Sequence, residues 1–227
     1  TNLDTKDAIV YDVTTHEMDQ ATDWAGCILE LILIGENPYN FNGINYVEGL
    51  EKCYSNGGYG PYACNIWALE AFKAAGHPIE EQLITTVKNQ ARSETFDLDM
   101  RSWALAAVNE WLTEEERFEI VNSIRDTQMT EGMVSDDEIG MFWNFYYNYA
   151  NSQTHGCVLS GLTEADVNFE AFCNMGGITP LTVVRDKYMK KGEGFIYCLD
   201  PDMVLSYGYN KDIIVGLGDV MNGSNVW

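Results

Sequence analysis

The residues best suited to acid–base chemistry are the two aspartates of the run DLDMR over residues 97–101, which an arginine follows. A carboxylic acid donates a proton near neutral pH only where burial or a second negative charge raises its pKa. Asp97 would supply that charge to Asp99, whereas Arg101 would lower the pKa of Asp99 and oppose acid catalysis. The alternative is structural, because Asp99 would cap the amide groups of a helix over 100–111.

A metal centre is the second chemistry to consider, and the sequence argues against it. His155 and Cys157 are two residues apart, so they would not share a helical face, and a catalytic zinc needs three protein ligands. The acidic run 136–138 offers the oxygen ligands that Ca²⁺ prefers, but it lacks the spacing of a calcium loop. None of the six cysteines forms a C-x-x-C pair, so we expect buried thiols, no metal and no cofactor.

Aromatic side chains are the third candidate for binding. Residues 141–149 read MFWNFYYNY, and Trp143 lies where the repeat spacing described below stretches. We interpret this run as a lid or binding loop at the mouth of a cavity. Further aromatics would line the same cavity and bind sugars, planar ligands or cations: Trp24, Trp67, Trp103, Tyr207 and Tyr209. For Trp67 and Trp103 the alternative is burial in the core.

The elements that would position these residues form a repeat. The pattern W-A-L-x-A occurs at Trp67 and again 36 residues later at Trp103. Helices that are apolar nearly all round alternate with amphipathic helices whose outer face is acidic, and a helix apolar on every side must be enclosed by others. We therefore expect an all-α fold, an α/α toroid in which about five to six helical hairpins form an inner and an outer ring.

The boundaries of these helices follow from the same patterns. Inner helices are predicted over 22–34, 63–75, 99–111, 154–163 and 211–221. Outer helices are predicted over 79–91, 114–128 and 180–190, and one short strand over 195–199. A capping box at Thr113 and Glu116, and Thr179 followed by Pro180, mark the starts of two outer helices.

Composition excludes several classes of partner. The 227 residues include 13 Lys and Arg against 35 Asp and Glu, a formal net charge of −22. This charge disfavours nucleic acids and anionic membrane surfaces, which both need basic side chains. Hydrophobic residues make up 46% of the chain, enough for a core, but no apolar run is long enough to span a bilayer. Residues 1–20 have the composition of an acidic tail or linker, and 21–227 are predicted to form one toroid domain.

Several segments follow one another in an order that resembles a known family: 59–79, 97–108, 152–167, 179–184 and 194–195. In this respect the chain resembles the prenyltransferase/squalene-oxidase-repeat domains of bacterial surface proteins. Those domains belong to the α/α-toroid superfamily of terpenoid cyclases and protein prenyltransferases. The resemblance implies the toroid fold over roughly residues 22–227 and an exported, cell-surface protein of which this chain is a part.

The resemblance also suggests specific chemistries, and the chain departs from each. Residues 97–101 resemble the D-x-D-D motif of class II terpene cyclases, with Asp99 as general acid, but Met100 replaces the last aspartate. The region of His155 resembles the zinc-histidine region of protein prenyltransferases, but the chain has no Asp-x-Cys pair. Cobalamin carriers share the toroid, although their second domain has no counterpart here. Fold alone does not decide among these activities.

The sequence therefore favours a non-catalytic module that binds a small molecule, a carbohydrate or another surface protein in the central cavity of the toroid. Helix N-termini around that cavity supply free N–H groups for a ligand with acceptor atoms. The candidate ligand-binding residues are Asp23, Trp24, Asn65, Trp67, Asp99, Trp103, Trp143, His155, Tyr207 and Tyr209. The alternatives are an enzyme related to class II cyclases, with Asp99 as the acid, and a cobalamin carrier.

Overall fold

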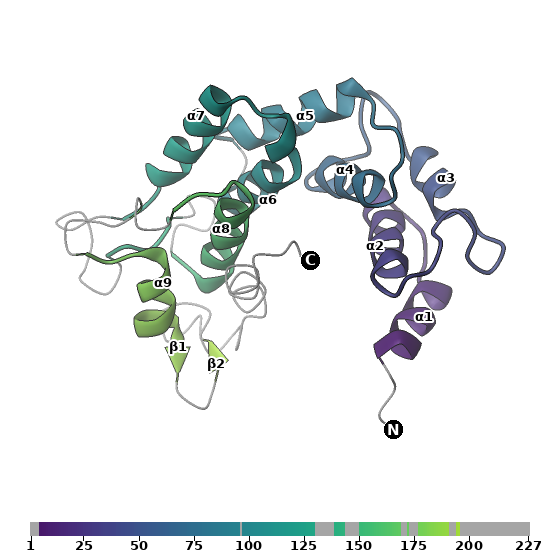
Figure 1. Ribbon diagram of the computed structural model, residues 1–227, viewed down its shortest axis with the longest axis horizontal. Helices are drawn as coiled ribbons and strands as arrows, with labels where there is room; N and C mark the ends of the chain where they lie inside the picture. Colours follow the sequence, from purple (N-terminus) through teal and green to yellow (C-terminus); the bar gives the residue numbers. More distant parts are fainter. Residues whose placement is uncertain are drawn as a thin grey trace. The chain divides into compact units, whose positions relative to one another are not determined.

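The chain is mostly helical, which confirms the all-α class (Figure 1). The computed structural model describes residues 5–95, 97–129, 139–143, 150–168, 172, 177–190 and 194–195. Within this part the only strands are β1 (Met189–Lys190) and β2 (Gly194–Phe195), which pair antiparallel. The chain divides into two compact units, Thr1–Val87 and Lys88–Trp227, and each is described by itself.

Unit 1 is built around α2 (Ala21–Leu33), which packs against α3 (Tyr46–Glu51) and α4 (Cys64–Ala74). The buried residues of α2 recur every three or four positions, which is the spacing of one helical face. In α4, by contrast, most residues are buried, as expected for a helix that is apolar nearly all round. The predicted helices 22–34 and 63–75 are therefore confirmed, and each packs on the other.

The start of the chain differs from the predicted tail. Residues Thr5–Thr15 form α1, which contacts α2. Val13 is buried, and the Tyr46 hydroxyl donates a hydrogen bond to its carbonyl oxygen at 3.4 Å. The acidic composition of this segment does not indicate a helix. The helix forms because its buried side chain packs against a neighbouring element.

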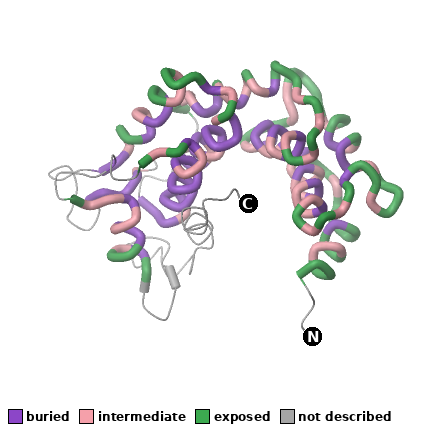
Figure 2. Tube along the Cα trace, in the orientation of Figure 1, coloured by how far each residue is buried: buried purple, intermediate pink, exposed green. Residues whose placement is uncertain are grey.

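Unit 2 is built around α6 (Leu98–Val108) and α8 (Ser152–Glu164), which pack against each other. Both helices are buried along most of their length, as Figure 2 shows in purple. The approach is close, since a Cβ atom on Gly161 of α8 would lie 2.4 Å from the backbone oxygen of Ser102. The helices predicted over 99–111 and 154–163 are thus confirmed, the first ending in the 3₁₀ turn η1 (Asn109–Trp111).

The predicted outer helices have mixed outcomes. Those over 79–91 and 114–128 correspond to α5 (Glu81–Arg92) and α7 (Glu114–Arg125). The helix predicted over 180–190 is wrong in its second half. There α9 (Pro180–Val183) continues as a π-helical turn, η3 (Val184–Tyr188), and then as β1. The predicted strand 195–199 begins in β2, and the remainder, like the helix predicted over 211–221, lies outside the described residues.

Three cysteines of the described residues, Cys27, Cys53 and Cys64, are free thiols. Cys27, Cys64 and Cys157 are buried, and Cys53 is partly exposed. Burial, together with the nearby carboxylates of Glu30, Asp12 and Asp23, raises the pKa of Cys27 to about 12. A thiol with so high a pKa is a poor nucleophile, so Cys27 acts as a small apolar side chain.

Candidate functional site

A pocket in unit 2 brings together side chains from the end of α7, from α6 and from the segment before α6. Its volume is about 280 Å³, and its lining consists of Glu94, Arg101, Ser123, Asp126 and Thr127. Arg101 is only 3% exposed, Glu94 and Asp126 are exposed, and the two hydroxyl residues are half-buried. Carboxylates, hydroxyls and a buried guanidinium group thus line one small concave surface.

The DLDMR run places Arg101 at this site. The Asp97 side chain caps α6 by accepting the backbone N–H of Met100 at 2.9 Å. Arg101 is one turn away from the cap, and its Nη2 donates to the Ser123 hydroxyl of α7. The guanidinium group therefore lies between α6 and α7, held from one side by a neutral hydroxyl.

The guanidinium group of Arg101 has a hydrogen-bond donor without an acceptor. Its Nε is buried and has no hydrogen-bond partner, and the group forms no ion pair within the described residues. Burial lowers the pKa of Arg101, and the charge of Glu94 opposes that shift. Arginine remains charged in proteins, so the pocket holds a buried positive charge whose direct partner is uncharged.

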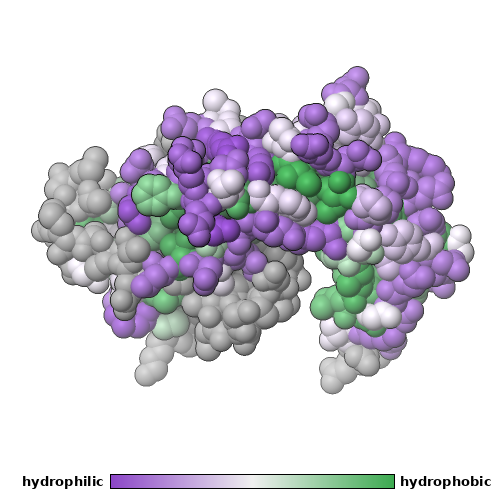
Figure 3. All heavy atoms as spheres, turned by 45° about the horizontal axis from the view of Figure 1, so that its top comes forward, coloured by the Kyte–Doolittle hydropathy of each residue, from purple (hydrophilic) through white to green (hydrophobic). Residues whose placement is uncertain are grey.

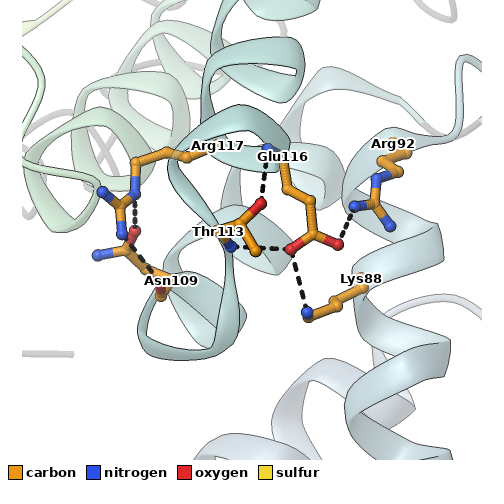
Figure 4. Close-up of polar contacts among 6 residues, drawn as sticks. All are labelled: Lys88, Arg92, Asn109, Thr113, Glu116 and Arg117. Atoms are coloured by element: carbon orange, nitrogen blue, oxygen red, sulfur yellow. Dashed lines mark hydrogen bonds and ion pairs between the residues drawn. The ribbon is translucent and has the colours of Figure 1, made fainter.

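Two other basic residues of unit 2, Lys88 and Arg92, pair with a carboxylate, as buried or half-buried cations usually do. The Glu116 carboxylate accepts from Lys88 Nζ at 3.2 Å and from Arg92 Nη2, while its other contact is the Thr113 backbone N–H at 2.8 Å (Figure 4). The Thr113 and Glu116 capping box is confirmed. The hydrogen bonds from Thr113 and Arg92 lower the pKa of Glu116 to about 2. Lys88 and Arg92 thus face a carboxylate, whereas Arg101 faces a serine.

Trp143 supports a wall of the pocket. Its backbone N–H donates to the Thr127 carbonyl oxygen at 2.9 Å, and its side chain packs against a buried cluster that includes Met141. Phe142 is fully buried. The lid hypothesis for 141–149 is therefore wrong at Met141 and Phe142, which belong to the core. Trp143 is partly buried, and 144–149 lie outside the described residues.

Asp99 occupies the first turn of α6 and is 4% exposed. The capping role considered for Asp99 belongs to Asp97 instead, because the helix begins at Leu98, two residues before the helix over 100–111 that Asp99 would cap. The partner expected to lower the pKa of Asp99, Arg101, hydrogen-bonds to Ser123. Trp103, one turn further along α6, is partly buried.

His155 is completely buried in α8 and lies within the core. Its Nε2 is 2.7 Å from the Pro180 carbonyl oxygen, so this nitrogen carries the proton and donates it. Its ring contacts Phe142 and Tyr188 at centroid distances of 5.3 and 5.6 Å. Burial lowers the pKa of His155 to about 4, the Pro180 contact acting in the opposite direction. A neutral, enclosed imidazole is a core residue and has no route to a ligand.

Three of the predicted residues in unit 1 have structural roles. Asp23 Oδ2 accepts the backbone N–H groups of Asp19 and Gln20 at the start of α2. Trp24 packs its ring edge-on to Tyr46 and against Gly49, where a Cβ atom would lie 2.3 Å from the indole.

Asn65 fixes the loop before α4. Its side chain accepts from the Tyr59 N–H at 2.8 Å and donates to the Gly60 carbonyl at 3.4 Å. Trp67 is partly buried on α4. Tyr207 and Tyr209, like the acidic run 136–138, lie outside the described residues.

Sequence reasoning missed most of the pocket. Glu94, Ser123, Asp126 and Thr127 carry no local pattern, and they meet only because α6 packs beside α7. One signal was available: Arg101, like Asp99, is a charged residue in a helix whose other residues are mostly apolar. Such a residue must find a partner or line a polar site.

The described residues contain no group of three or more His, Cys, Asp or Glu side chains that could hold a metal ion. In the same part of the chain, no helix has both the length and the apolar character needed to cross a membrane. The face drawn in Figure 3 is hydrophilic over much of its described surface, with hydrophobic residues between. Comparisons with protein-family models, curated proteins and solved structures found no match for the chain.

Proposed function

We propose that the chain is a non-catalytic ligand-binding module of an exported bacterial cell-surface protein, and that Arg101 anchors its ligand. The observation that carries the proposal is the buried guanidinium group, which lines a pocket and faces a serine hydroxyl where a carboxylate would normally stand. Burying a charge without an opposite charge is costly, and such an arrangement is retained where a ligand completes it.

The toroid architecture and the surface location rest on the family resemblance and on the repeat. Two features support them: α2 packs on α4 in unit 1, and α6 packs on α8 in unit 2. Three of them, α4, α6 and α8, are buried along most of their length, as expected of the inner ring of a toroid, whereas α2 is buried along one face. The Arg101 pocket lies between α6, a predicted inner helix, and α7, a predicted outer helix. This place differs from the central cavity of a toroid, so ligand binding in that cavity is a separate proposal.

Binding is favoured over catalysis because the pocket lacks a group prepared for proton transfer. Asp99 does not line it, and His155 is enclosed elsewhere in the unit. At about 280 Å³ the pocket lies at the lower limit of small-molecule sites, which span roughly 300–1,000 Å³. A small ligand fits this volume better than a cobalamin does.

The test is native mass spectrometry of the chain after incubation with a mixed panel of amino acids, oligosaccharides, isoprenoid diphosphates, triterpenes and cobalamins. We expect a ligand that is retained unchanged by the wild type and lost from Arg101→Met. The variant should fold, because replacing a buried ion with an apolar side chain of similar length changes stability little or raises it, within about 1 kcal/mol here.

Three results would contradict the proposal. Retention of the same ligand by Arg101→Met would remove Arg101 from the site. A chemically converted ligand would make the chain an enzyme, with Asp99→Asn as the next variant to assay. If no member of the panel is retained by the wild type, the binding function itself is wrong for this pocket.

A further inference from the structure

The positive and negative charges of the pocket differ in how far they are buried. The guanidinium group of Arg101 is buried, whereas the carboxylates of Glu94 and Asp126 are exposed. All three residues line the same cavity, and the charge of Glu94 acts on Arg101. A ligand that enters therefore meets negative charge at the exposed rim and positive charge at the buried end.

A simple anion is a poor match for this arrangement. It must pass two carboxylates, and the chain as a whole carries a formal net charge of −22. A simple cation is attracted to the rim but leaves the buried guanidinium group without a counter-charge. A molecule that carries both charges satisfies the two ends together.

We propose, on the basis of the binding function above, that this pocket takes a small zwitterion of amino-acid size. Its carboxylate meets Arg101, and its ammonium group faces Glu94 and Asp126. The cavity volume of about 280 Å³ limits the ligand to one in which the two charges are a few bonds apart.

The donor geometry of Arg101 supports a carboxylate as its partner. Nε is unpartnered, and Nη2 is occupied only by the Ser123 hydroxyl. Rotation of the Ser123 side chain about its Cα–Cβ bond would free Nη2. Nε is enclosed as well, so the same rotation must also open it. Nε and Nη2 lie on one edge of the guanidinium plane, and a carboxylate that reaches this edge can accept from both in the bidentate arrangement that arginine favours.

The ammonium end explains why the rim is acidic. Glu94 and Asp126 are exposed, and neither forms a salt bridge within the described residues. An ammonium group has three donors and can contact both carboxylates. Each contact with an exposed carboxylate adds only a few-fold in affinity, so the two together correspond to roughly tenfold.

The experiment follows the Arg101 Nε–H signal by NMR in the ¹⁵N-labelled chain while one of three probes is added up to tens of millimolar. The probes are L-alanine, propionate, which lacks the ammonium group, and ethylamine, which lacks the carboxylate. We expect L-alanine to shift the signal at concentrations about tenfold lower than propionate does. Ethylamine should leave the signal unchanged.

Variants assign each end of the ligand. The double variant E94Q/D126N should remove the preference for L-alanine over propionate, and Arg101→Met should abolish retention of L-alanine in native mass spectrometry. Glu119→Gln is the matched control, because Glu119 is an exposed carboxylate on α7 that does not line the pocket. It should leave the preference as in the wild type.

The outcomes separate this inference from the proposed function. If propionate binds as tightly as L-alanine, or if E94Q/D126N keeps the preference, the zwitterion is wrong and the binding site stands. If none of the three probes shifts the Arg101 signal, while another panel ligand is retained in an Arg101-dependent manner, the zwitterion is again wrong. If nothing in the panel is retained, both proposals fail.

Discussion

At the scale of single residues, His155 shows how burial converts a titratable side chain into a structural one. It is fully enclosed, bonded through Nε2 to the Pro180 carbonyl, and its pKa is lowered to about 4 from the usual 6.5. Its Nδ1 is buried with no hydrogen-bond partner in the described part of the chain. Protonation at Nδ1 would therefore place a charge in an apolar enclosure with nothing to receive it.

This environment predicts how stability depends on pH. Because the folded pKa of His155 lies below the unfolded one, the unfolded chain binds the proton more readily between pH 4 and 6.5. The contribution of His155 is complete above pH 6.5 and is lost as the pH falls toward 4, by about 3 kcal/mol in total. Denaturant unfolding at a series of pH values from 4.5 to 7 measures it.

The comparison is with His155→Gln, which keeps a donor for the Pro180 carbonyl. This variant is expected to be less stable at pH 7 but to lose less stability on acidification through the same window. Equal pH dependence in the two proteins would show that His155 titrates with an ordinary pKa and is not enclosed as described.

The candidate residues also show what sequence can indicate at this scale. Residue type identified Asp23, Asn65 and His155 as polar groups in apolar helices. Asp23 and Asn65 bond to the nearby backbone, whereas His155 bonds through Nε2 to the distant Pro180 carbonyl and leaves Nδ1 without a partner. The same reasoning singled out the DLDMR run but favoured Asp99 as its functional member. Arg101 is the residue that lines a pocket, because the neighbouring α7 presents Ser123 to it.

At the scale of elements, the contact between α6 and α8 depends on a glycine. A Cβ atom at Gly161 would lie 2.4 Å from the Ser102 oxygen, and that atom belongs to the backbone and cannot rotate away. Gly161→Ala is therefore expected to separate the two helices and destabilise unit 2 by about 1–3 kcal/mol. Denaturant unfolding compared with the wild type measures the change.

Gly26 provides the matched control, since it also lies inside a helix but has no atom within 4 Å of an added Cβ. Gly26→Ala should be stabilising by about 1 kcal/mol, which is the difference in helix propensity. If Gly161→Ala were as stable as Gly26→Ala, the close packing of α6 on α8 would be wrong.

Element boundaries were predictable where local chemistry sets them. The repeated apolar pattern located α2, α4, α6 and α8, and the cap residues Thr113 and Thr179 mark the starts of α7 and α9. Helix α1 and the π turn η3 were missed because tertiary packing decides them: Val13 and Tyr188 are buried against other elements. The pocket was missed for the same reason, since it exists only between two packed helices.

At the scale of the whole molecule, the dominant feature is the formal net charge of −22. Like charges at this density repel one another in the folded chain more than in the expanded unfolded chain. The exposed ion pairs act in the opposite direction, but pairs such as Lys6 with Glu36 and Lys52 with Glu48 are solvent-accessible and contribute little each. We therefore expect the repulsion among the negative charges to outweigh the stabilisation from the exposed ion pairs.

This balance predicts that salt stabilises the protein. Raising sodium chloride from low to physiological ionic strength shortens the screening length to about 8 Å and weakens long-range repulsion more than contacts between neighbours. The Tm should rise, and a gain of about 1 kcal/mol corresponds to roughly 2–4 °C for a chain of this length.

Choline chloride at the same ionic strength is the control, because its bulky cation cannot occupy a site made for a small metal ion. An equal rise in both salts identifies screening of the net charge. A rise in sodium chloride alone would show specific cation binding, and a fall in both would show that ion pairs such as those of Glu116 outweigh the repulsion.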